Sequence, residues 1–127
     1  MKKIISLILV AVMCLAFASC SAFDGRKKVR EQADTAPVFS MVAYAQMFEN
    51  NEVRAKEKYE GKVFKFTGEV YEVNERYCFV NGIKYMQVFL EKEDLLKLNK
   101  GQEYTFVGVF EQTPFYPTLK DAILLDD

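Results

Sequence analysis

Apolar and polar side chains alternate in the same way in two ten-residue segments of the chain. The first is GKVFKFTGEV at residues 61–70, and the second is GQEYTFVGVF at residues 101–110. A period of two predicts strands with one buried face, and a glycine inside a strand is typical of a bend or a barrel corner. One face of each segment carries three large apolar side chains and one glycine: Phe64, Phe66, Gly68 and Val70, then Tyr104, Phe106, Gly108 and Phe110.

A helical period precedes the first of these strands. Apolar residues recur every three or four positions between Ser40 and Tyr59, which predicts two short helices or one bent helix. Ser40 is suited to cap the first turn, and Asn51 is suited to cap a second start within the segment. Gly61 is a typical stop signal, so the helical segment is expected to end before it.

The rest of the pattern predicts three more strands and one more helix. Strands are expected at residues 77–80, 83–90 and 118–125, and Asn81-Gly82 is a typical two-residue hairpin turn between the first two. Residues 91–99 begin with acidic side chains and continue with leucines and a lysine, a charge order that suits a short helix.

Five strands, two of them bent, predict a mainly β fold. The expected architecture is a small five-stranded OB-type barrel with an N-terminal helical segment and a short helix between the third and fourth strands. Closing a short sheet on itself removes the exposed edges that favour aggregation. The same elements would also form a five-stranded sheet packed on the N-terminal helix, and the pattern alone leaves this alternative open.

The first twenty residues, MKKIISLILVAVMCLAFASC, have the organisation of an export signal. Lys2 and Lys3 precede an uncharged apolar stretch that is shorter than the roughly 20 residues of a membrane-spanning helix. Residues 17–20 resemble the lipobox of bacterial lipoproteins, in which Cys20 would become the first mature residue and carry the lipid. Residues 16–18 form a competing site for cleavage after Ala18, and that alternative stays open.

These features divide the chain into a lipoprotein signal peptide at 1–19, a lipid-anchored linker at 20–38 and an OB-type domain at 39–127. The protein is therefore expected to be exported and held on a membrane of the bacterial cell envelope by the lipid on Cys20. The expected linker carries a basic cluster at residues 26–30 and lacks apolar periodicity. Such a segment suits either a solvated tether or contact with anionic lipid headgroups.

Composition argues against most catalytic and metal-dependent functions. The chain has no histidine, and it lacks a glycine-rich phosphate loop and paired cysteines at metal-binding spacing. Cys78 lies in an apolar run and is expected to be a buried, unreactive side chain. Glu91, Glu93 and Asp94 form the densest acidic group, but they lack the spacing of a calcium loop. We therefore expect no enzyme activity, no cofactor and no metal.

Net charge bears on the partners. Cleavage before Cys20 removes two of the 17 basic residues and none of the 18 acidic ones, which leaves a net charge of −3. Nucleic-acid-binding domains usually carry a strong basic excess. A nucleic-acid partner is therefore not expected from the charge balance.

Several short motifs resemble the anticodon-binding-like (tRNA_anti-like) OB-fold family of bacterial exported and lipid-anchored proteins. The resemblance covers about residues 39–125 and implies an OB fold, but it implies no particular ligand. The motifs are Asn51, Ala55, Tyr59-Glu60-Gly61-Lys62, Phe66-Thr67-Gly68 and Val70, followed by Leu98, Lys100-Gly101-Gln102 and Phe106-Val107-Gly108.

An OB barrel usually binds its ligand on the face of strands 2 and 3 and on neighbouring loops. That surface predicts an envelope-anchored, non-enzymatic binding module for a protein, peptide or glycan. The alternative is a domain that binds single-stranded nucleic acid or nucleotides through the same aromatic side chains. The candidate ligand-binding residues are Tyr71, Arg76, Tyr77, Tyr85, Phe115 and Tyr116.

The Cys20→Ala variant tests the predicted anchor. It should leave the membrane fraction or fail to be processed, because stable attachment requires the acyl chains carried by this cysteine. Fractionation with mass spectrometry of the mature N-terminus measures both effects. Equal membrane retention of the variant, with an unmodified N-terminus on the wild-type protein, would rule out the lipoprotein assignment.

Overall fold

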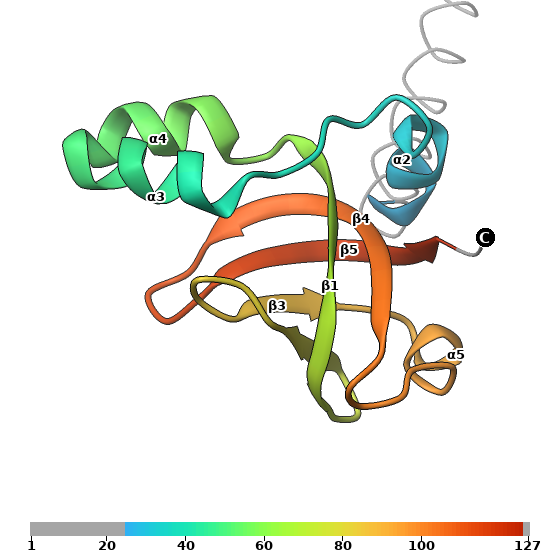
Figure 1. The fold of residues 1–127 in the computed structure, drawn as a ribbon. Helices are drawn as coiled ribbons and strands as arrows, with labels where there is room; N and C mark the ends of the chain where they lie inside the picture. Colours follow the sequence, from blue (N-terminus) through green and yellow to red (C-terminus); the bar gives the residue numbers. More distant parts are fainter. Residues whose placement is uncertain (1–24, 126–127) are drawn as a thin grey trace, which may run out of the picture.

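The computed structural model describes residues 25–125, so the expected signal peptide and Cys20 lie outside the described residues. Figure 1 shows the path of the chain from the helices into the barrel. The helices are α2 (Gly25–Gln32), α3 (Met41–Asn50), α4 (Glu52–Tyr59) and α5 (Lys92–Leu95), and the strands are β1 (Val63–Val73), β2 (Tyr77–Val80), β3 (Met86–Phe89), β4 (Glu103–Gln112) and β5 (Pro117–Leu125).

The five strands form a closed barrel in the order β1-β2-β3-β5-β4. Antiparallel ladders join β1 to β2 and β4, β2 to β3, and β4 to β5. A short parallel ladder between β3 and β5, with Gln87 opposite Thr118 and Val88 opposite Leu119, completes the closure. The predicted five-stranded barrel is confirmed, and the alternative of an open sheet packed on a helix is wrong.

The two similar segments of the sequence are direct antiparallel partners in β1 and β4. Phe66 pairs with Phe106 at the centre of the ladder. On either side, Phe64 lies opposite Gly108 and Gly68 lies opposite Tyr104. Each copy therefore places its glycine against a large ring of the other copy. The sequence similarity arises because two paired strands obey the same large-and-small pattern in opposite directions.

Close approach of neighbouring strands requires both glycines. A Cβ atom on Gly68 would lie 2.6 Å from Cγ1 of Val80, and one on Gly108 would lie 2.9 Å from Cβ of Ala122. Gly108 also sits within a register shift between β4 and β5, as expected for a glycine at a bend. In β1 the register shift comes after Val70, so the expected bend at Gly68 lies further along the strand.

An aromatic cluster fills the end of the barrel that α3 and α4 cover. Phe39 stacks on Phe110 with ring centroids 4.8 Å apart, and Tyr44 and Tyr59 pack edge to face at 5.1 Å. The side chains of Ser40 and Asn51 accept hydrogen bonds from backbone amides at the starts of α3 and α4. The prediction of two capped helices is therefore confirmed, and their aromatic side chains close one end of the core.

Helix α2 replaces part of the expected linker. Val29 is fully buried and Ala33 nearly so, against an outer apolar patch of the barrel formed by Val63, Val107, Val109 and Ile123. Among the described residues of this segment, Val29, Ala33 and Ala36 pack on the patch, which is too few apolar side chains to give a periodic signal in the sequence. The chain then crosses to α3 with Pro37 and Phe39 hydrogen-bonded to the backbone of Lys65.

Three other elements differ in length from the prediction. The Asn81-Gly82 turn is part of a longer loop at residues 81–85, because Asn81 bonds to Glu69 of β1 rather than across the hairpin. Strand β3 is accordingly shorter than residues 83–90, and α5 is shorter than residues 91–99. Between residues 25 and 125, no helix has the length and apolar character needed to cross a bilayer.

Two phenylalanine-to-alanine variants test the packing of the barrel. Phe106 is fully buried, so Phe106→Ala should lower the free energy of unfolding by about 3–5 kcal/mol. Phe115→Ala is the matched control, because Phe115 is 84% exposed and the same truncation there should cost little. Thermal and urea unfolding followed by circular dichroism measures both. Equal stability losses in the two variants would contradict the assigned core.

Candidate binding surface

Strands β2 and β3 direct alternate side chains to the two sides of the barrel wall. Cys78, Val80, Met86 and Val88 point inward and are fully buried. Tyr77 lies opposite Phe89 and Phe79 lies opposite Gln87 in the ladder, and these outward side chains are half-buried. An antiparallel pair whose outer surface carries three rings offers a broad contact surface.

Ring contacts extend this surface onto β1 and to Tyr116, which directly precedes β5. The ring centroid of Phe79 lies 5.2 Å from that of Tyr77 and 4.8 Å from that of Tyr116. Tyr85 lies 6.1 Å from Phe79 and stacks on Tyr71 at 4.8 Å, with 20° between the ring planes. We call this set the aromatic face: Tyr71, Tyr77, Phe79, Tyr85, Phe89 and Tyr116.

The stacked pair is the most open part of the aromatic face. Tyr71 is 44% exposed and Tyr85 is 39% exposed, although each ring covers the other. Nζ of Lys100 lies 5.7 Å from the ring centroid of Tyr71. Partial desolvation and the neighbouring Tyr71 phenol raise the pKa of Tyr85 above its ordinary value. Its hydroxyl is therefore a neutral hydrogen-bond donor at physiological pH.

The structure brings four of the six predicted residues into one surface. Tyr71, Tyr77, Tyr85 and Tyr116 all belong to the aromatic face, whereas Arg76 lies exposed in the β1–β2 turn beside Tyr77. Sequence reasoning missed Phe79 and Phe89. The two-residue spacing from Tyr77 would have indicated Phe79, but Phe89 joins Tyr77 only through the β2–β3 register.

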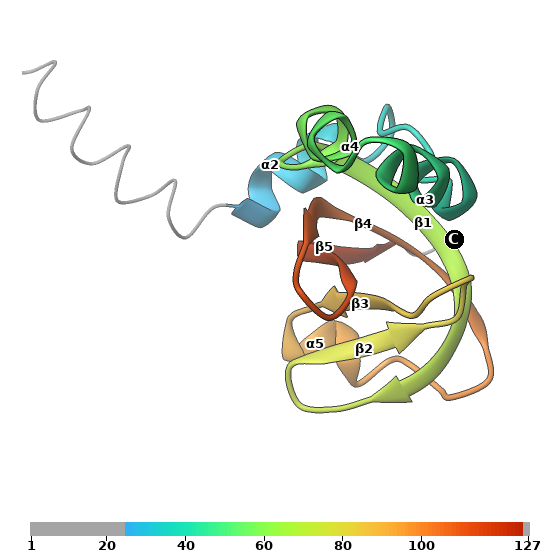
Figure 2. The same cartoon turned by 90° about the vertical axis from the view of Figure 1, so that its left-hand side faces the viewer.

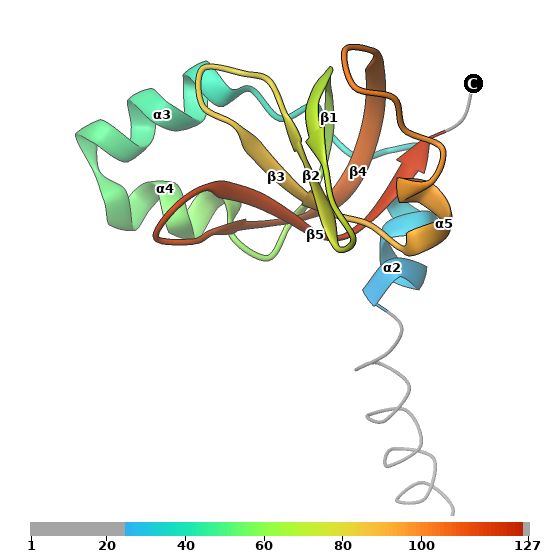
Figure 3. The same ribbon diagram turned by 90° about the horizontal axis from the view of Figure 1, so that it is seen from below.

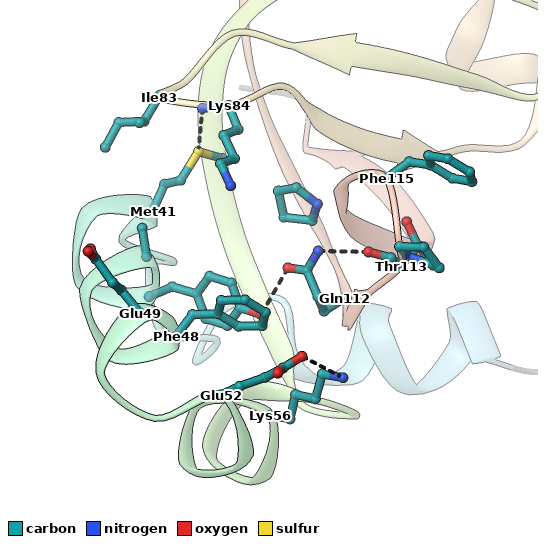
Figure 4. Close-up of a pocket in the computed structure, with 14 residues that line it drawn as sticks. Met41, Phe48, Glu49, Glu52, Lys56, Ile83, Lys84, Gln112, Thr113 and Phe115 are labelled. Atoms are coloured by element: carbon teal, nitrogen blue, oxygen red, sulfur yellow. Dashed lines mark hydrogen bonds and ion pairs between the residues drawn. The ribbon is translucent and has the colours of Figure 1, made fainter.

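Phe115 belongs to a separate cleft of about 760 Å³ between the helices and two loops of the barrel. Figure 4 shows Met41 and Phe48 on the helical side, Ile83 and Lys84 on the 81–85 loop, and Phe115 on the β4–β5 loop. The Tyr44 hydroxyl donates to Oε1 of Gln112 at 2.9 Å, and Nε2 of Gln112 donates to the Thr113 carbonyl at 2.8 Å. These bonds hold the β4–β5 loop against α3.

The described part of the chain offers few side chains suited to metal binding or nucleophilic catalysis. No group of three or more His, Cys, Asp or Glu side chains within residues 25–125 could hold a metal ion. Cys78 is fully buried, and burial raises the pKa of its thiol to about 12. A neutral, inaccessible thiol is a poor nucleophile. Glu91 instead pairs with Arg26 and Arg30, and Asp94 accepts a hydrogen bond from the Leu124 amide.

A family model described as tRNA_anti-like matches residues 2–127. The chain belongs to the tRNA_anti-like family. The family suggested by the motifs in β1 and β4 is thereby confirmed. Most of those motif residues lie in the core or at glycine positions, so they account for the fold of this tRNA_anti-like domain rather than for a ligand.

A solved structure supports the same fold. The crystal structure of a lipoprotein from Klebsiella pneumoniae subsp. pneumoniae MGH 78578, which is proposed to bind nucleic acid, matches with a TM-score of 0.62 and 18% sequence identity. The match covers 76% of this chain and 97% of that chain. At this identity the similarity concerns the fold alone. A search of curated proteins gives no match.

The buried phenol of Tyr44 predicts a loss of stability at alkaline pH. Burial, followed by the charges of Glu60 and Glu52, raises the Tyr44 pKa from 10.0 to about 12. The unfolded chain therefore ionises first, and the free energy of unfolding should fall between about pH 10 and pH 12. Tyr44→Phe should lose less stability over this range, although the lost hydrogen bond costs about 1 kcal/mol at neutral pH.

Urea unfolding of both proteins at several pH values measures this difference. Circular dichroism at neutral pH controls for the fold of the Tyr44→Phe variant. An identical alkaline loss in the two proteins would contradict the assignment to Tyr44.

Proposed function

We propose that this tRNA_anti-like protein is an exported, lipid-anchored and non-enzymatic binding module whose ligand surface is the aromatic face. The single observation that carries the proposal is the solvent-exposed stack of Tyr71 on Tyr85, continued through Phe79 to Tyr116. Three side chains of this surface, Tyr77, Phe79 and Phe89, lie on β2 and β3, where OB barrels usually bind their ligands, and the Tyr71–Tyr85 stack adjoins them on β1 and the 81–85 loop. The rings are held by their neighbours, so little side-chain entropy is lost when a partner covers them.

The ligand proposed first is a protein, peptide or glycan of the cell envelope. Flat tyrosine surfaces suit sugar rings, prolines and other aromatic side chains, and their hydroxyls can bond to the polar rim of such a partner. Charges around the surface are mixed, since exposed Glu72 and Glu75 accompany Arg76, Lys84 and Lys100. A mixed rim suits a neutral or weakly charged partner better than a polyanion.

Single-stranded nucleic acid is the second candidate. Bases stack on tyrosines with little regard to sequence, and Lys100 above Tyr71 supplies a cation beside the stack. The structural neighbour from Klebsiella pneumoniae is itself proposed to bind nucleic acid. Binding of this kind depends steeply on salt, because phosphate contacts release counterions.

The double variant Tyr71→Ala/Tyr85→Ala tests the proposed surface. It should weaken ligand binding at least tenfold, equivalent to about 1.4 kcal/mol, because two stacking partners are lost together. The ligands to compare are purified peptidoglycan fragments, an envelope protein extract and a single-stranded oligothymidine, each at low and at physiological salt. Val53→Ala is the control, since it truncates an exposed apolar side chain on α4, outside the aromatic face.

The outcomes separate the two candidates. Capture of a peptide, protein or glycan that persists at physiological salt supports the first. Oligothymidine binding that falls steeply with salt and is lost in Lys100→Glu supports the second. Undiminished binding of every ligand by the double variant would contradict the proposed surface, and normal circular dichroism spectra exclude misfolding as the cause.

A further inference from the structure

The start of α2 is fastened to the barrel by several polar contacts. Nε of Arg26 donates to the Ala122 carbonyl at 3.1 Å, and Nη2 donates to the Phe89 carbonyl at 3.5 Å. Nη1 of the same side chain lies 3.8 Å from Oε1 of Glu91. A Cβ atom on Gly25 would overlap the Asp121 carboxylate, so the helix start lies directly against β5.

The apolar side of α2 is fastened as well. Val29 is fully buried among Val107, Val109 and Ile123 on the outer surface of β4 and β5. Together with the Arg26 contacts, this packing makes α2 a fixed part of the domain from its first turn. Five residue-to-residue steps separate the expected lipid at Cys20 from Gly25 at the start of α2, and they reach at most about 18 Å when fully extended.

A tether this short limits how the barrel can sit on a membrane. A domain joined to its lipid by a long flexible linker can rotate freely above the membrane. A domain whose first helix begins within about 18 Å of the lipid must keep that helix, α2, near the headgroups. The exposed surface of α2 carries Lys27 and Lys28, and Arg30 is also exposed. Basic side chains at this position are attracted to anionic lipid headgroups.

The barrel topology separates the Tyr71–Tyr85 end of the aromatic face from α2, although the Phe89 carbonyl at the other end accepts a hydrogen bond from Arg26. In the closed order β1-β2-β3-β5-β4, β2 is the strand farthest from the β4–β5 pair that α2 covers. Figure 2 shows α2 at the upper left of the barrel and β2 across its lower front. Tyr71 lies in the part of β1 that pairs with β2, beyond the β1–β4 ladder that ends at Glu69, and Tyr85 lies in the loop that joins β2 to β3. The Tyr71–Tyr85 pair therefore lies beside β2, away from the β4–β5 side that carries α2.

We infer that the lipid on Cys20 and helix α2 form one membrane-attachment unit, which holds the β4–β5 side of the barrel against anionic headgroups and turns the Tyr71–Tyr85 pair outward. This inference rests on the lipid anchor of the proposed function. It adds a fixed orientation and assigns the basic side chains of α2 to the lipid surface.

Fluorescence quenching in vesicles tests the orientation. The lipid-modified protein is placed in phosphatidylglycerol–phosphatidylethanolamine vesicles that contain a nitroxide-labelled headgroup. A fluorophore is attached at Glu31→Cys on α2 or at Ile83→Cys on the 81–85 loop, two exposed positions on opposite sides of the barrel. Cys78 does not interfere, because it is fully buried. We expect at least threefold stronger quenching at position 31 than at position 83.

Charge variants test the role of α2. Lys27→Glu/Lys28→Glu should reduce the quenching difference at least twofold, because the reversed charges are repelled by anionic lipid. Arg54→Glu/Lys58→Glu is the matched control on exposed positions of α4, and it should leave the difference unchanged.

Failure of this inference and failure of the anchor give different results. Equal quenching at positions 31 and 83, in vesicles that retain lipid-modified protein, would overturn the orientation and leave the anchor intact. A mature protein without lipid on Cys20 would overturn both. Mass spectrometry of the mature N-terminus distinguishes the two results.

Discussion

The antiparallel pairing of β1 with β4 is the constraint on which the rest of the structure depends. Phe66 and Phe106 meet at the centre of this ladder, and each glycine of the two similar segments lies opposite a large ring of the other. The glycines also let β2 and β5 approach more closely than a Cβ atom would permit. Without that close approach the short strands could not curve into a closed barrel, and β3 could not reach β5.

Closure of the barrel gives its inside and outside different roles. The inside is filled by aliphatic and aromatic side chains, and α3 and α4 cover one open end with Tyr44 and Tyr59. Figure 3 shows these helices at the opposite end of the barrel from α2. Because the core is complete without the outer rings of β2 and β3, those rings are available for a partner, as the proposed function requires.

The outer surface of the barrel is itself divided. An aliphatic patch on β4 and β5 binds α2, whereas the aromatic face on β2, β3 and the neighbouring part of β1 is partly open to solvent. Aliphatic side chains suit permanent packing, while tyrosines can be covered and uncovered because their hydroxyls remain satisfied by water. This division agrees with one side of the barrel serving attachment and the other serving recognition.

The sequence by itself determined the local features of this protein. Alternation around Phe66 and Phe106 indicated the strands, Ser40 and Asn51 indicated the helix starts, and two glycine-containing segments indicated a barrel. These features were predictable because each depends on residues close together in the chain. The family motifs gave the same fold, since most of their side chains lie in the core or at close contacts.

Only the tertiary structure decided which distant residues meet. The stack of Tyr71 on Tyr85 depends on the loop at residues 81–85 folding back toward β1, and Phe89 joins Tyr77 through the strand register. Helix α2 has one fully buried side chain, Val29, so its position depends on a patch contributed by strands far along the chain. The physical reason is the same in each case. Segments that are distant in the sequence pair to form these surfaces, so no local sequence pattern can predict them.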